Sequence, residues 1–204
     1  MGILKGGLSV RRYHVQGELP DSWRDTFIDA LQNNAFREPL TETRKDASMG
    51  WVQIHNLLDH DFADINRWLY NQYAVFALRI DKKVLPAKLF KAHFEKRQAE
   101  WCKANNRDRC PPGAREELKE LLEFEMLQKT LPRVQLFELA WNTTEGWLIF
   151  HNDSEVPNDT FRKHFYKTFG FRLMPWLPID ELSQESGLGE QLMSMGASDL
   201  REGE

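Results

Sequence analysis

The chain has 204 residues, a hydrophobic content of 41% and a formal net charge of −4. This hydrophobic content excludes an intrinsically disordered protein, and no apolar stretch reaches the roughly 18 residues of a membrane-spanning helix. The negative net charge would argue against nucleic-acid binding if it were spread evenly, but it is not. Residues 79–109 contain 10 Lys and Arg against 4 Asp and Glu, whereas residues 178–204 contain 7 Asp and Glu against one Arg.

Strand-type and helix-type patterns alternate along the chain. Runs of β-branched and aromatic residues bounded by Gly or Pro predict strands, and apolar residues at intervals of three and four predict helices. In chain order the expected elements are a strand at 3–15, a helix at 21–36, a strand at 50–54, a helical turn within 55–72, a strand at 73–80, helices at 86–103 and 114–130, a hairpin of strands at 134–141 and 147–151, a helix at 158–169 and a strand at 171–177.

This order predicts an α+β fold with mainly antiparallel sheets in two halves and a helical pair projecting between them. The corresponding division of the chain is an N-terminal α/β half (1–84), the helical pair (85–130), a C-terminal ββαβ half (131–177) and an acidic, disordered tail (178–204).

The helix at 86–103 carries the most pronounced charge pattern. A step of 100° per residue places Phe90, Phe94 and Trp101 on one side, which we expect to pack. The opposite side presents four cations: Lys88, Lys91, Lys96 and Lys103. These lysines either contact a polyanion or pair with the acidic residues of the following helix: Glu116, Glu120 and Glu123.

The helix at 158–169 repeats this arrangement on a smaller scale. Phe161, Phe165 and Phe169 share a face that we expect to be buried. Its other face carries a second basic patch: Arg162, Lys163, Tyr166 and Lys167.

Neither a metal site nor a catalytic motif is predicted. Five metal-type side chains cluster in ten residues, at His55, Asp59, His60, Asp61 and Asp64. Their spacing matches no established motif, and helix capping by an aspartate explains them as well. We therefore expect no cofactor. The two cysteines, Cys102 and Cys110, are too few for a disulfide framework, so they predict reduced thiols and a cytoplasmic location.

Six short motifs occur in an order that resembles a known family. They are LKGGLSVRRY at 4–13, Ala35-Phe36, Gly50-Trp51-Val52, IDKKVLPAKLFKAHFEKR at 80–97, Leu131-Pro132-Arg133 and WNTTEGWLIF at 141–150. Together they resemble the bacterial recombination-associated RdgC family over most of residues 1–177. The resemblance implies a cytoplasmic, nucleoid-associated protein that binds double-stranded DNA with little sequence preference. It also implies a head-to-head homodimer that closes into a ring around DNA, and restraint of recombinase filaments.

On this reading the DNA-binding residues are Lys82, Lys83, Lys88, Lys91, Lys96 and Arg133, with a second patch of Arg162, Lys163 and Lys167. Longer family members continue for about another domain, so the chain is expected to be a short member. Gln135 replaces an aromatic residue of the family pattern that could contact a partner or DNA. The resemblance therefore supports DNA binding by this chain more strongly than ring closure. Two alternatives remain open: a metal-dependent exonuclease, which is a label that the family carries, and a truncated protein-interaction module whose acidic tail competes with DNA.

Overall fold

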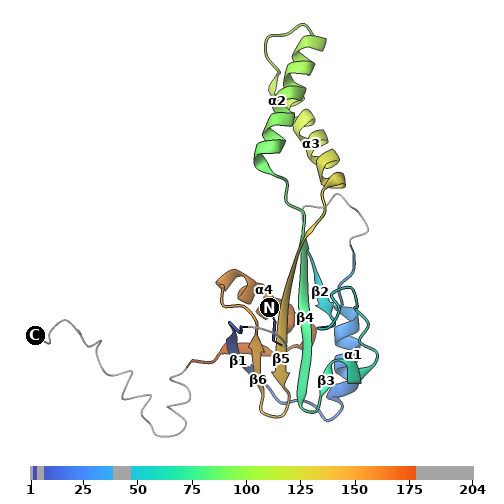
Figure 1. The fold of residues 1–204 in the computed structure, drawn as a ribbon, viewed down its shortest axis with the longest axis vertical. Helices are drawn as coiled ribbons and strands as arrows, with labels where there is room; N and C mark the ends of the chain where they lie inside the picture. Colours follow the sequence, from blue (N-terminus) through green and yellow to red (C-terminus); the bar gives the residue numbers. More distant parts are fainter. Residues whose placement is uncertain (1, 4–6, 39–46, 178–204) are drawn as a thin grey trace, which may run out of the picture. The chain divides into compact units, whose positions relative to one another are not determined.

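The computed structural model of the chain describes residues 2–3, 7–38 and 47–177. Within these residues, four α-helices accompany a seven-stranded antiparallel sheet, which confirms the predicted α+β class (Figure 1). The expected disordered tail at 178–204 lies outside the described residues. No helix in the described ranges has the length and apolar character that a bilayer crossing requires.

The elements follow one another in nearly the predicted order. They are β1 (Arg11–Gln16), α1 (Trp23–Asn33), β2 (Ser48–Val52), a 3-10 helix (Ile65–Arg67), β3 (Leu69–Tyr70), β4 (Tyr73–Lys82), α2 (Ala87–Ala104), α3 (Pro112–Lys129), β5 (Arg133–Asn142), β6 (Trp147–Phe150), α4 (Glu155–Phe169) and β7 (Arg172–Pro175). The strand order is β2-β4-β5-β6-β1-β7, and β3 pairs with β4.

Two element boundaries differ from the sequence prediction for identifiable reasons. The first strand begins at Arg11 rather than residue 3, because its pairing with β6 starts where Arg11 lies opposite Phe150, the last residue of β6. Helix α4 begins at Glu155 rather than Asn158. The residue at its N-cap position is Ser154, and Asn158 lies inside the helix, where its buried side chain accepts a hydrogen bond from the hydroxyl of Tyr13 at 2.6 Å.

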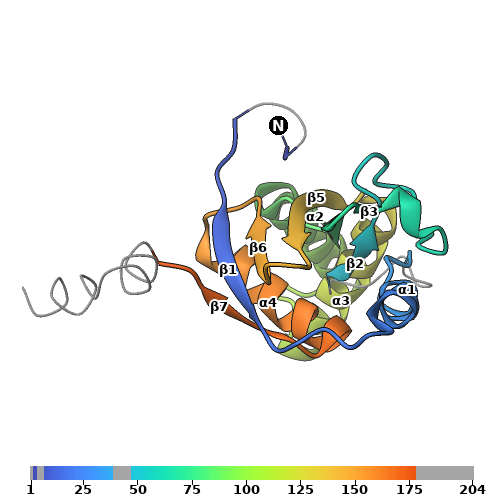
Figure 2. The same cartoon turned by 90° about the horizontal axis from the view of Figure 1, so that it is seen from below.

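The chain divides into two compact units, each built from several segments. The first unit comprises residues 1–30, 65–75 and 138–204. In it, α4 lies along one face of β1, β6 and β7 (Figure 2). Phe161 and Phe165 are fully buried there, as predicted, whereas Phe169 is only half-buried. The ring of Phe161 stacks on Phe150 with centroids 4.0 Å apart.

The second unit comprises residues 31–64 and 76–137, and its sheet portion requires a glycine. An ideal Cβ at Gly50 would lie 2.4 Å from backbone atoms of Phe36, so any larger residue would push these segments apart. The close approach is held by the Phe36 N–H, which donates to the Trp51 carbonyl at 2.9 Å. Trp51 in turn packs edge-on against Phe76, with ring centroids 5.1 Å apart.

Helices α2 and α3 belong to this second unit, where they follow β4 and precede β5 as a hairpin (Figure 1). The predicted packing side of α2 is only partly covered, because Phe90, Phe94 and Trp101 are half-buried and no residue of α2 is fully buried. The main neighbour of α2 in this hairpin is α3, and one neighbouring helix cannot enclose an entire apolar face.

Candidate nucleic-acid interface

The cations that the sequence singled out fall into two groups, one in each unit. The first group lies on or next to the α2–α3 hairpin: Lys82, Lys83, Lys88, Lys91, Lys96 and Arg133. The second group lies on α4 and is called the α4 patch: Arg162, Lys163 and Lys167.

Four lysines of α2 are called the α2 lysines: Lys88, Lys91, Lys96 and Lys103. All four are exposed. The Nζ atom of Lys91 lies 3.8 Å from Glu95, and that of Lys96 lies 3.9 Å from Glu100, both at i,i+4 spacing on the same helix. The side chains of Lys91 and Lys96 are 77% and 75% exposed, so these pairs are weak and solvent-screened. A phosphate group could replace either carboxylate at little energetic cost.

A different residue connects the two helices. Arg97 donates through two guanidinium nitrogens to the two carboxylate oxygens of Glu125 on α3. This pairing, first through its hydrogen bonds, lowers the pKa of Glu125 below its ordinary value. Sequence reasoning left interhelical pairing of the lysines open as an alternative, and the structure shows such a pair at Arg97. Its position three residues after Phe94, on the packing side, was the available signal.

Lys83 is bonded to the end of α3. Its ammonium group donates to the carbonyl of Leu127 at 2.8 Å, in the last turn of α3. Carbonyls at a helix C-terminus lack partners within the helix and favour a nearby cation. Lys83 therefore caps α3, while Lys82 at the end of β4 and Arg133 at the start of β5 are both exposed.

Arg162 and Lys163 of the α4 patch line a groove of about 510 Å³ between α4 and β7. Lys163 and Lys167 are exposed, and Arg162 lies 3.6 Å from Asp159 on the preceding turn. Arg172 on β7 also lines the groove and adds a cation that sequence reasoning did not select. The groove thus has positive charge on both walls.

The candidate metal residues are used in local turns. Asp59 accepts the N–H of Asp61 at 3.1 Å, and Asp61 accepts the N–H of Ala63 at 3.0 Å. Nowhere in the described ranges do three His, Cys, Asp or Glu side chains converge on a point that could hold a metal ion.

Comparison with protein-family models finds a match. The family model described as "Putative exonuclease, RdgC" matches residues 10–191, which is most of the chain. Among curated proteins, none matches.

Proposed function

The chain belongs to the RdgC family, and from this premise we propose that it binds double-stranded DNA without sequence specificity and acts in recombination in the bacterial nucleoid. The proposal includes a homodimer as the binding form and the restraint of recombinase filaments as the biological role. The observation that carries it is the set of exposed α2 lysines, beside which the ion pair to α3 is made by Arg97.

The chemistry of this face favours phosphate over bases as the contacted group. An ammonium group is a compact point charge on a flexible stem, which suits phosphate oxygens but does not by itself select a base. Lysines 88, 91 and 96 span more than two turns of α2, so several phosphates along one strand could be contacted at once. Binding of this kind tolerates any sequence and weakens steeply with salt.

The test uses the purified full chain with end-labelled linear duplexes of unrelated sequence. We expect retarded migration of every duplex at low salt, without shortening, in the presence of Mg²⁺ or Mn²⁺. The name of the matching family raises exonuclease activity as the second candidate. Progressive shortening of the labelled duplex would support that candidate. If the duplex is neither retarded nor shortened at about 50 mM salt or below, where phosphate contacts are strongest, both candidates are rejected.

A further inference from the structure

The groove between α4 and β7, called the α4–β7 groove, combines positive charge with apolar surface. Four charged side chains line it: Arg162, Lys163, Arg172 and Asp159. The other lining residues are Tyr166, Leu173 and Met174, of which Tyr166 and Met174 are 51% and 47% exposed. A phosphate backbone can use the cations of this groove but offers nothing apolar to Leu173 or Met174. The lining therefore favours an acidic ligand that also carries apolar side chains.

The cations of this groove can accept a carboxylate from a ligand. Arg162 lies 3.6 Å from Asp159, one turn earlier on α4, and both side chains are half-exposed. Such a pair is weak, so a carboxylate from elsewhere can replace it at little cost. Arg172 lies on the opposite wall, on β7. A guanidinium group can hold a carboxylate through two parallel hydrogen bonds, so each wall offers a site for one acidic side chain.

Strand β7 gives the groove an open backbone edge. It pairs with β1 on one side, and on its other side no strand pairs with it among the described residues (Figure 2). The residues that line the groove come from α4 and β7 and none of them from β1. The N–H and C=O groups at such an edge can pair with another extended segment. The groove therefore fits an extended peptide better than a rigid duplex.

The residues that follow β7 have the complementary chemistry. Strand β7 ends at Pro175, and the N–H of Trp176 donates to the carbonyl of Arg12 at 2.9 Å. Residues 178–204 start immediately after Leu177 and contain 7 Asp and Glu against one Arg. Their first five residues are PIDEL, in which two acids lie between two apolar residues. At roughly 3.3 Å per extended residue, a chain that reverses after Leu177 can run back along the four residues of β7.

We propose that the α4–β7 groove binds the acidic segment of this same chain, residues 178–204. Its carboxylates pair with the arginines of the two walls, and its apolar side chains cover Tyr166 and Met174. A segment tethered this closely has an effective concentration of the order of millimolar, so weak individual contacts are enough to fill the groove. The contact does not depend on whether the chain binds duplex DNA.

The test is the fluorescence anisotropy of a labelled peptide with the sequence of residues 178–204, titrated with two full-length chains. One is the parent, and in the other, called the amide variant, the seven acids of this segment are changed to Asn or Gln: Asp180, Glu181, Glu185, Glu190, Asp199, Glu202 and Glu204. The amide variant should bind the peptide about tenfold more tightly than the parent, whose own segment competes for the groove. Equal binding by both chains, or binding by neither, would overturn the proposal.

Matched substitutions in the amide variant locate the contact. Arg162→Gln together with Arg172→Gln should weaken peptide binding about fivefold or more. Lys167→Gln removes an exposed cation of α4 that does not line the groove and should change it by less than about twofold. Equal effects of these changes would overturn the assignment to the groove.

A second peptide separates groove binding from attraction by charge alone. With Ile179→Ser and Leu182→Ser it keeps every charge, and it should bind the amide variant about tenfold more weakly than the first peptide because apolar burial is lost. Equal affinity of the two peptides would overturn the proposal. A short duplex that binds the amide variant through Arg162 and Arg172, when the peptide does not bind, would assign the groove to DNA instead.

Discussion

Replacing all four α2 lysines by Gln tests whether the outward face of α2 carries the DNA contacts. The structure indicates that the fold should tolerate this change. The ion pairs lost are those with Glu95 and Glu100, and exposed i,i+4 pairs contribute about 0.3–0.5 kcal/mol each. The expected loss is below about 1 kcal/mol in total, because Arg97 and Lys83 keep their partners on α3. Helicity by circular dichroism should stay unchanged, and the melting temperature should fall by a few degrees at most, since about 1 kcal/mol lowers it by roughly 2–4 °C in a chain of this size.

Duplex affinity should respond far more than stability does. Each lysine that contacts a phosphate contributes about 0.9 to the slope of log K against log salt, so up to four lost contacts would reduce that slope by as much as about 3.6. Affinity should fall alike for every sequence, measured by fluorescence anisotropy from about 50 to 200 mM salt. The Lys→Arg variant at the same four positions is the matched control and should keep the slope. An unaltered slope in the Gln variant would reject α2 as the interface and direct attention to the α4 patch.

Three further outcomes follow from the structure. Phe165→Ala should cost about 3–5 kcal/mol of unfolding free energy, because its ring is fully buried against Trp141, while Lys163→Ala should cost less than about 0.5; equal losses in denaturant titrations would show that the buried face of α4 is misassigned. Because the pKa of Glu125 is lowered in the folded state, its ion pair contributes fully to stability above the ordinary pKa of 4.5, and this contribution is lost as pH falls through the lowered pKa. On acidification below pH 4.5 the melting temperature of Glu125→Gln should therefore drop less than that of the parent protein. Parallel curves of melting temperature against pH would contradict this. Deletion after Leu177 removes 7 acidic residues against one Arg and should tighten duplex binding at low salt; unchanged affinity would remove the idea that this segment competes with DNA.

Local periodicity explains why much of the fold could be predicted. The buried positions of Phe161 and Phe165 follow from helical spacing, and both are fully buried. The start of α4 was placed too late, although Ser154 before the helix and Pro157 in its first turn are local signals of a helix start. The partner of the buried Asn158 side chain could not be found in this way, because Tyr13 lies 145 positions away and a contact across that separation leaves no trace in local pattern.

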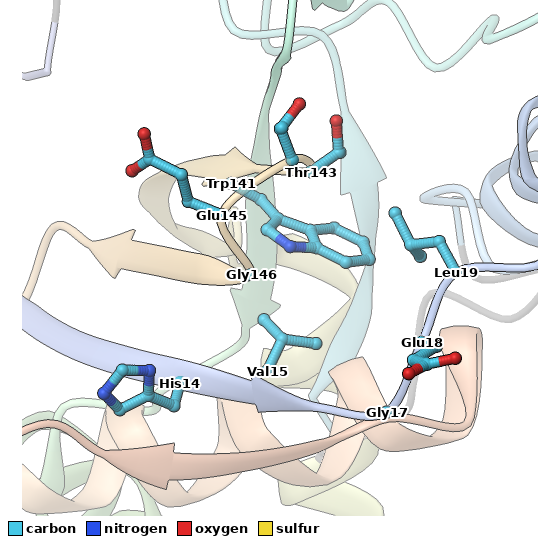
Figure 3. A pocket seen from close by; sticks show the side chains of 10 residues that line it. His14, Val15, Gly17, Glu18, Leu19, Trp141, Thr143, Glu145 and Gly146 are labelled. Carbon is cyan, nitrogen blue, oxygen red and sulfur yellow. The ribbon is translucent and has the colours of Figure 1, made fainter.

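The candidate sites show the same division between local and distant information. The exposure of the α2 lysines could be predicted from the helical periodicity of α2 without knowing where α3 lies. The partner of Arg97 could not be predicted without knowing how α3 packs, since Glu125 lies 28 residues away and several other glutamates of α3 have comparable spacing. A cavity of about 370 Å³, lined by residues of the segments 14–19 and 141–146, could not be predicted from sequence, because the end of β1 and the β5–β6 loop are brought together only by the pairing of β1 with β6 (Figure 3).

The separation between residues that hold the hairpin and residues that face outward determines how salt should act on this protein. Arg97 and Glu125 are 28% and 38% exposed at their side chains, whereas the side chains of Lys91 and Lys96 are more than 70% exposed. Ionic screening acts strongly on exposed charges and weakly on partly buried, hydrogen-bonded pairs. Raising the salt concentration should therefore release DNA well before it loosens α2 from α3. A salt slope measured in that range then reports phosphate contacts and not unfolding of the hairpin, which is the condition that makes the lysine variants interpretable.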